Sequence, residues 1–162
     1  MSAVDKNQAV IDFLLACPAI RDNPLFFNFL EAQDDNKQII TQATDNALNE
    51  KYIDGTVKRR YMFTIIDFRS IAYSPVPKVP DITSQNVESL LDVQGILDWV
   101  TEQAELENYP DFGENCIIDE MVTTSDTPNL DGLDTSVSPV LAKYSISIQI
   151  DYIDTSKSIW NN

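Results

Sequence analysis

Within residues 142–153, apolar and polar side chains alternate as far as Tyr152, and this pattern constrains the fold more than any other in the chain. The apolar positions are Tyr144, Ile146, Ile148, Ile150 and Tyr152, and the polar positions are Lys143, Ser145, Ser147, Gln149 and Asp151. A repeat of two residues predicts a β-strand whose successive side chains point to opposite faces. One face must then be buried while the other is wet or faces a partner, which is typical of an antiparallel sheet.

The segment KYIDGTVKRRYMFTI, residues 51–65, predicts a hairpin that leads into a second strand. Asp54 and Gly55 are a preferred pair for a two-residue type I′ turn, in which both central residues have positive φ. Residues 51–53 would pair with the chain from Thr56 onward. Apolar residues between Met62 and Phe68 fall on both faces of the second strand. A strand of this kind is covered on both sides, so we expect it to be central in its sheet.

The remaining patterns predict both helices and strands. We expect a helix at 4–16, strands at 25–30, 38–44 and 116–124, a proline-rich linker at 74–80 and a polar loop at 125–139. Two more helices are expected at 84–92 and 95–107, separated at Gly95 because glycine destabilises a helix interior. Thr83 or Ser84 would cap the first of these helices. The expected buried face of this helical block comprises Val87, Leu90, Leu91, Leu97, Val100 and Ala104.

This order of elements predicts one α+β domain over residues 1–153, followed by a tail at 154–162. The domain would be a mostly antiparallel sheet flanked by an N-terminal helix and a central helical block. The cysteines, Cys17 and Cys116, show no metal-binding or redox spacing, so we expect two buried free thiols in a reducing compartment. The apolar run at 10–17 contains Asp12 and is too short to span a membrane, which favours a soluble intracellular protein.

Acidic residues dominate the charge of the chain, with 26 acidic and 11 basic residues and a net charge of −15. Four of the basic residues, Lys51, Lys58, Arg59 and Arg60, belong to the predicted hairpin. The chain between residues 78 and 143 holds fourteen acidic residues and no basic one. Such a surface repels nucleic acid and anionic membranes, and the simplest interpretation is a solvated acidic face.

The residue types give little support to catalysis. The chain has no histidine, which removes the commonest general base and metal ligand, and its 4 glycines form no phosphate-binding loop. The adjacent carboxylates Asp34-Asp35 and Asp119-Glu120 are more readily explained as solvated charges. NLDGLD, residues 129–134, lacks the ligand spacing of a calcium loop. We therefore expect no catalytic residue, metal or cofactor, and instead a binding or assembly role.

The hairpin segment also carries a resemblance to a known family. KYIDGTVKRRYMFTI is similar to a signature of phage tail terminator, or tail-completion, proteins, in which a phrase close to KYIDGG-KRQY precedes an apolar strand. The family's helical W-[IV]-x-E-Q phrase has its counterpart in residues 99–103, WVTEQ, and its final alternating strand in residues 143–152. Thr56 departs from the family's frequent second glycine. The proline-rich segment 74–80 and the tail 154–162 are particular to this chain.

The resemblance implies a structural virion protein without enzymatic activity. Such proteins form a homo-oligomeric ring, usually a hexamer, that caps the tail tube and provides the surface that joins tail to head. DNA passes through the ring without specific binding. The implied partners are other copies of the chain, the tail tube protein, head-tail connector or neck proteins, and a sheath protein if the tail is contractile. The implied location is the tail-neck junction of the virion, after assembly in the bacterial cytoplasm.

In such a ring, the segment 79–142 and the polar face Ser145, Ser147, Gln149 and Asp151 are candidates to line the lumen or contact a neighbour. Lys58, Arg59 and Arg60 could pair with acidic residues of the adjacent subunit or of the tube protein; alternatively, they balance acids within their own subunit. Trp160 is predicted to pack on a neighbouring subunit or the connector, with a frayed tail as the alternative. Two other functions stay open, a head-tail connector and, from a different class, a small prophage-encoded enzyme or adaptor.

Overall fold

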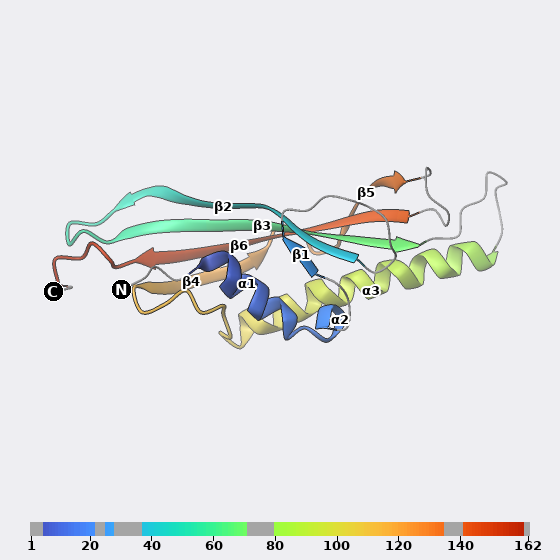
Figure 1. Ribbon diagram of the computed structural model, residues 1–162, viewed down its shortest axis with the longest axis horizontal. Helices are drawn as coiled ribbons and strands as arrows, with labels where there is room; N and C mark the ends of the chain where they lie inside the picture. Colours follow the sequence, from blue (N-terminus) through green and yellow to red (C-terminus); the bar gives the residue numbers. More distant parts are fainter. Residues whose placement is uncertain (1–4, 22–24, 28–36, 71–79, 135–140, 161–162) are drawn as a thin grey trace.

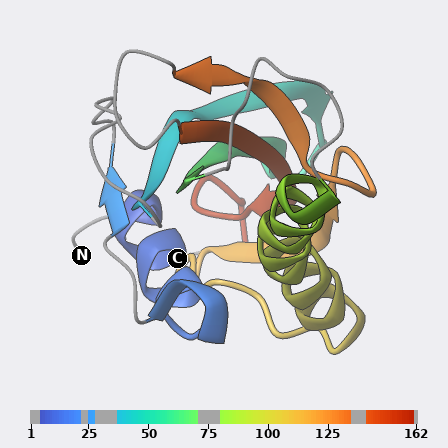
Figure 2. The same cartoon turned by 90° about the vertical axis from the view of Figure 1, so that its right-hand side faces the viewer.

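The fold is an elongated, curled sheet with helices on one of its faces (Figures 1 and 2). It is seen in a computed structural model that describes residues 5–21, 25–27, 37–70, 80–134 and 141–160. The elements are α1 (Lys6–Leu15), α2 (Pro18–Arg21), β1 (Leu25–Phe27), β2 (Lys37–Lys51), β3 (Val57–Ser70), α3 (Pro80–Glu105), β4 (Cys116–Thr123), β5 (Asn129–Asp134) and β6 (Leu141–Asp154). The predicted α+β class, with a mostly antiparallel sheet flanked by helices, is confirmed.

The sheet has the strand order β1-β2-β3-β6-β4, and every neighbouring pair except β1–β2 is antiparallel. β3 and β6 pair without a break from Val57 opposite Asp154 to Ser70 opposite Leu141. Both predictions for these strands are confirmed, because β3 is central and Tyr144, Ile146, Ile148, Ile150 and Tyr152 are all buried on β6. The strand predicted at 38–44 is the first half of a longer one, since β2 continues to Lys51.

The polar segment after β4 is not only a loop, as the sequence had suggested. Residues 129–134 form β5, which pairs with the first half of β6, while β4 pairs with its second half. Both β4 and β5 are antiparallel to β6 on the same edge, so they act as one strand interrupted near residues 124–128. Hydrogen bonding to β6 is what orders this polar stretch, and its sequence alone gives no sign of a partner. Residues 135–139 of the predicted loop lie outside the described residues.

α1 agrees with the predicted N-terminal helix. The Asp5 carboxylate caps it by accepting hydrogen bonds from the backbone N–H groups of Asn7 at 2.9 Å and Gln8 at 3.3 Å. Val10 and Leu14, one turn apart, are buried against the sheet side of the fold. The helix ends just before Pro18, with which α2 begins, because a residue that precedes proline is disfavoured in helical geometry.

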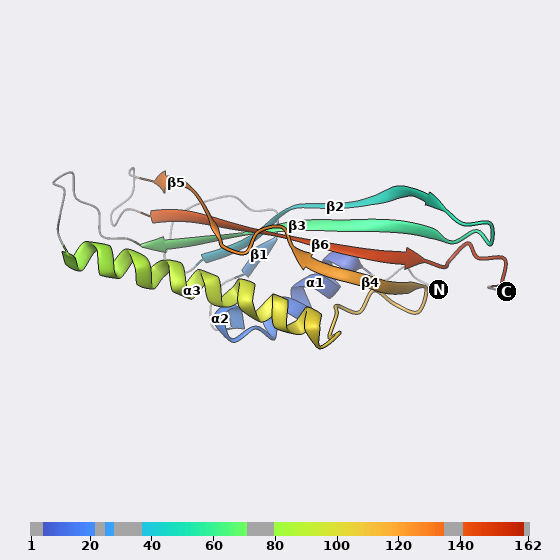
Figure 3. The same ribbon diagram turned by 180° about the vertical axis from the view of Figure 1, so that it is seen from behind.

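α3 is one continuous helix of 26 residues, so the predicted break at Gly95 is wrong, as is the predicted cap at Thr83 or Ser84. It begins at Pro80, which suits a helix's first turn because proline needs no N–H partner there. The other residues of the predicted linker lie outside the described part. A Cβ atom on Gly95 would meet no neighbouring atom. Glycine makes the helix about 1 kcal/mol less stable than alanine would, which is too little to end a helix that packs along a sheet (Figure 3).

The face that α3 buries is also shifted from the predicted one. Val93, Ile96, Leu97 and Val100 are buried, whereas Leu91 is 62% exposed and Leu90 is 37% exposed. A single unbroken helix keeps one phase of its 3.6-residue period, which places Val93 and Ile96 toward the sheet.

An ion pair and an aromatic cluster join the helical layer to the sheet. Asp67 and Arg69 on β3 form a buried pair, with Nε and Oδ1 2.6 Å apart, and the Arg69 guanidinium lies 3.7 Å from Asp92 on α3. At the other end of β3, Phe112 packs edge-on against both Tyr61, at 5.6 Å, and Tyr152, at 5.3 Å. This insertion fixes the segment after α3 against the sheet. Cys17 is buried, as expected, whereas Cys116 is only half-buried.

Candidate functional site

The turn between β2 and β3 lies at one end of the long axis of the molecule (Figures 1 and 3). The Gly55 N–H donates to the Tyr52 carbonyl at 3.0 Å, and the Tyr52 N–H donates to the Thr56 carbonyl at 2.9 Å. Gly55 has a φ of 89°, while Asp54 does not have positive φ. The predicted type I′ turn is therefore wrong, because only one of its two positions has positive φ. The hydrogen bonds match a three-residue hairpin loop that ends in a glycine.

The C-terminal tail is anchored to this turn. The Ile159 N–H donates to the Asp54 carbonyl at 2.7 Å, and the Thr155 N–H donates to the Asn115 carbonyl at 2.8 Å. A Cβ atom on Gly55 would lie 2.2 Å from the carbonyl oxygen of Lys157, so only glycine fits beneath the tail. The frayed tail considered above is not what the described residues show, since the chain through Trp160 follows the hairpin.

Four apolar side chains of the turn and tail are exposed: Tyr52, Ile53, Ile159 and Trp160. We call these four residues the apolar tip. Ile53 is fully exposed and Trp160 is 79% exposed, although hydrogen bonds hold the adjacent backbone at Asp54 and Ile159. Exposed apolar side chains that form a contiguous patch are typical of a surface that binds another protein, so the apolar tip is a candidate for such a surface. Whether Trp160 contacts a neighbour or a connector stays a prediction.

The basic triplet next to the tip pairs with acids of its own chain. Lys58 lies 3.4 Å from Asp119 on β4, Arg59 lies 3.0 Å from Asp154, and Arg60 binds Asp151. The alternative that these residues balance acids within their own subunit thus agrees with the structure. The three side chains keep between 23% and 36% exposure, so their contact with a second subunit or a tube protein stays a prediction.

These ion pairs change the protonation equilibria near the tip. The hydrogen bond with Asp119 raises the pKa of Lys58, against the opposing effect of burial. Burial on its own would raise the pKa of Asp154, but hydrogen bonds from Ser156 and the Arg59 guanidinium together hold it below its ordinary value. Both shifts favour the charged forms, so the pairs are retained at neutral pH.

The polar side chains of β6 are less exposed to solvent than those of a strand with one face in water. Ser145 is 9% exposed and Asp151 is 5% exposed, while Ser147 and Gln149 are half-buried. Arg60 lies across Asp151, with Nε 2.8 Å from Oδ1 and the second guanidinium nitrogen 3.2 Å from Oδ2.

Other polar groups of this face also meet partners on β3. The Gln149 amide, when oriented with its oxygen toward Arg60, accepts from the guanidinium at 3.1 Å. The Ser147 and Thr64 hydroxyls lie 2.9 Å apart. Neighbouring strands therefore satisfy much of this polar face, which the alternation alone does not reveal. Its place in a lumen or at a neighbour stays a prediction.

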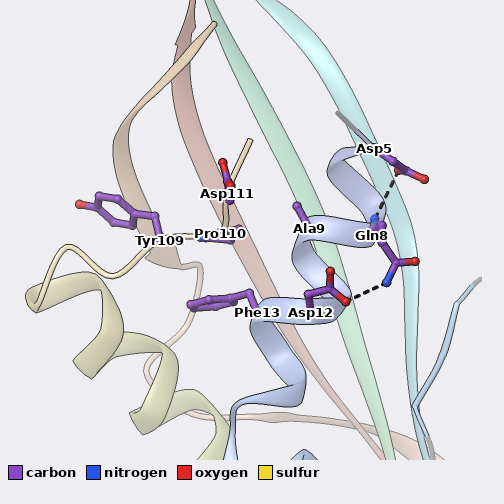
Figure 4. A pocket seen from close by; sticks show the side chains of 8 residues that line it. All are labelled: Asp5, Gln8, Ala9, Asp12, Phe13, Tyr109, Pro110 and Asp111. Atoms are coloured by element: carbon purple, nitrogen blue, oxygen red, sulfur yellow. Dashed lines mark hydrogen bonds between the residues drawn. The ribbon is translucent and has the colours of Figure 1, made fainter. Parts of the chain in front are cut away.

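A groove of about 500 Å³ lies between α1 and the segment that follows α3 (Figure 4). Its lining includes Asp5, Asp12, Phe13, Tyr109, Pro110 and Asp111, and we call it the α1 groove. Phe13 packs on Trp99 of α3 with ring centroids 5.0 Å apart, which fixes one apolar wall. The groove is apolar in its walls and carries three carboxylates. Sequence reasoning missed it, because its two sides are about a hundred residues apart and meet only through tertiary packing.

Most acidic and metal-ligand candidates of the sequence can be located among the described residues. These residues contain no group of three or more histidine, cysteine, aspartate or glutamate side chains that could hold a metal ion. Asp119 is paired with Lys58, the residues of NLDGLD belong to strand β5, and Asp34-Asp35 lies outside the described residues. Within the described ranges, no helix has the length and apolar character needed to cross a membrane.

Comparison with known proteins gives no relative, since neither a protein-family model nor a curated sequence matches this chain.

Proposed function

We propose that this protein is a phage tail terminator, a structural virion protein that assembles into a ring, caps the tail tube and joins it to the head. The observation that carries the proposal is the apolar tip, which presents Ile53 and Trp160 to water on a hydrogen-bonded backbone at one end of an elongated α+β subunit. Full burial of a side chain such as Ile53 is favourable by about 2 kcal/mol, so burial of the tip would favour binding to another protein.

The charges of the sheet support the same proposal. DNA binds cationic surfaces irrespective of sequence, so a ring through which DNA slides needs few free lysines and arginines. Lys58, Arg59 and Arg60 are held by Asp119, Asp154 and Asp151, which reduces their availability to phosphate. The similarity of residues 51–65 and 99–103 to phrases of the tail terminator family points the same way.

Electron microscopy and native mass spectrometry of the purified protein test the proposal. A terminator is expected to form rings about as wide as a tail tube and, when added to growing tubes, to stop their elongation. A protein that stays monomeric at all concentrations and leaves tube length unchanged would refute it.

The same samples separate the alternatives. A head-tail connector would form rings that bind heads and leave tube elongation unaffected. A prophage-encoded enzyme or adaptor would be a monomer that leaves the tubes free, and an enzyme would in addition turn over a substrate.

A further inference from the structure

We propose that β4 binds an extended basic segment of another protein, which pairs with the free edge of β4 as an added strand. β4 ends the sheet and, among the described strands, pairs with β6 alone. Its outer edge therefore carries backbone donors and acceptors that can pair with a further strand, a mode of peptide binding called β-augmentation. This site goes beyond the tail terminator function, because it depends on the edge of β4 and not on ring formation.

The hydrogen bonds at the end of β4 show which backbone groups face this edge. The Thr124 N–H donates to the carbonyl of Ser147, the residue opposite it, at 3.0 Å. Hydrogen-bonded and non-hydrogen-bonded pairs alternate along antiparallel strands, so the N–H and C=O groups of Thr123 and Met121 point away from β6. Among the described residues, none forms a hydrogen bond with these outward backbone groups.

A groove of about 360 Å³ follows this edge between β4 and the end of α3, and we call it the β4 groove (Figure 3). Its lining includes the five consecutive residues 119–123 of β4. Consecutive strand residues point to opposite faces of a sheet, so a groove that touches all five runs along the edge of the strand. The described chain thus leaves room beside the backbone groups that are free to pair.

The floor of the β4 groove is apolar. Val100 and Met121 are buried, and Ala104 and Tyr109 are half-buried beside them. Met121 belongs to the hydrophobic core and so points to the face of the sheet that the helices cover. In an added strand every second side chain points to this same face, where apolar side chains would cover the floor.

The charge of the β4 groove is negative even when its neighbours are counted. Glu105, Asp119 and Glu120 line it and are exposed, and no lysine or arginine is among its lining residues. Lys58 compensates Asp119, from which it lies 3.4 Å away. Arg60 attracts Glu120, but its guanidinium already binds an aspartate of β6. Glu105 and Glu120 therefore leave two uncompensated negative charges, which favour a basic occupant.

The faces of the strand predict the pattern of that occupant. Glu120 lies opposite Asp151 in the register, on the face away from the helices. Basic side chains on that face of an added strand would lie beside Glu120, while the alternate side chains cover the apolar floor. The basic triplet of this chain is itself paired within the central strand β3, so a second copy cannot supply it. The occupant is therefore a different protein, with a segment in which apolar and basic residues alternate.

Titration of the full chain with a synthetic peptide tests the site. The probe is a short peptide in which valine and lysine alternate, and its control has glutamate in place of every lysine. The lysine peptide is expected to bind and to shift the NMR amide signals of β4 and the end of α3. The glutamate peptide should bind at least about tenfold more weakly. No binding of the lysine peptide, or shifts confined to other parts of the molecule, would overturn the proposal.

Methylation of the peptide backbone separates strand pairing from simple charge attraction. The N–H groups of alternate residues point to the same edge of a strand, so N-methyl groups on the valines and on the lysines block opposite edges. One of the two methylated peptides should bind at least about tenfold more weakly, and the other should keep its affinity. Equal affinities of the two would show that the peptide does not pair with β4.

Two variants of the protein test its own side of the contact. Thr123→Pro removes an N–H that points away from β6, so the sheet keeps its hydrogen bonds while an added strand loses one. Glu120→Lys reverses a charge of the groove, and Glu114→Lys is its matched control, because Glu114 is exposed and outside the lining. The first two should weaken binding of the lysine peptide at least about tenfold, and Glu114→Lys much less. Circular dichroism checks the fold, and equal affinity of all three variants would contradict the site.

The outcomes also separate this site from the proposed function. If Thr123→Pro prevents ring formation and the wild-type protein does not bind the lysine peptide, β4 joins two copies of the chain, which overturns the basic partner. If Thr123→Pro loses the peptide but still forms rings that cap tubes, the site and the proposed function both stand. A wild-type protein that binds the peptide along β4 and never assembles would refute the proposed function alone.

Discussion

Replacing Gly55 with alanine tests whether the C-terminal tail is held against the hairpin turn. Two costs follow from the structure. A side chain at a φ of 89° costs about 1–2 kcal/mol, because its Cβ approaches the backbone closely. The new Cβ would also lie 2.2 Å from the Lys157 carbonyl oxygen, so the tail must move away and lose the hydrogen bond from the Ile159 N–H to the Asp54 carbonyl. That bond contributes about 1 kcal/mol.

We therefore expect Gly55→Ala to lower the free energy of unfolding by about 2–3 kcal/mol in the full chain. In a chain that ends at Ser156 the tail contact is absent, and only the backbone cost of about 1–2 kcal/mol should remain. Urea unfolding followed by circular dichroism measures both values. All proteins are compared at one concentration, because association would add to the apparent stability.

Gly95→Ala is the matched control, since Gly95 lies inside α3 and an added Cβ meets no atom within 4 Å. It should raise the free energy of unfolding by up to about 1 kcal/mol. Equal losses for Gly55→Ala in the full and shortened chains would show that the tail does not contact the turn. No loss in either chain would refute the positive φ at Gly55.

Three further predictions concern single sites. Glu107 follows the end of α3 and has a φ of 54°, and its N–H and that of Asn108 donate to carbonyls of the last helical turn. Glu107→Gly should therefore raise the free energy of unfolding by about 1 kcal/mol in the same urea assay, and a loss of stability would contradict the left-handed conformation. Burial raises the pKa of the Cys17 thiol, so an aromatic disulfide reagent should label Cys116 first and Cys17 only on unfolding, and equal native rates would refute this burial. The pKa of Asp154 in the folded protein lies below its ordinary 3.8. The ionised carboxylate therefore stabilises the fold fully above about pH 3.8, and this stabilisation is lost as the pH falls through the pKa of the folded state. Asp154→Asn should reduce the loss of stability on acidification, and an unchanged dependence of stability on pH below about 4 would contradict the shift.

Short-range chemistry determined much of the fold. The alternation at 142–153 was sufficient to predict β6 and its buried face, because a β-strand is the regular structure in which side chains repeat every two residues. The apolar residues on both faces of residues 62–68 were sufficient to place β3 in the centre. The step from Cys17 to Pro18 predicted the end of α1, because proline restricts the residue before it.

Other features needed the tertiary structure, because their partners are distant in sequence. The lack of a break at Gly95 depends on packing along the sheet, and β5 depends on pairing with β6. The turn at Asp54-Gly55 takes a three-residue form that a common sequence pair does not specify.

The candidate site divides in the same way. The sequence by itself determined the chemistry: a basic cluster in an acidic chain, a polar face on one strand and a C-terminal tryptophan. Only the tertiary structure decided the contacts, since it pairs the triplet with Asp119, Asp151 and Asp154, and brings α1 and the segment after α3 together into one groove. The physical reason is that backbone geometry and hydrophobic periodicity act within a few residues, whereas ion pairs and grooves form between side chains that only the folded chain brings together.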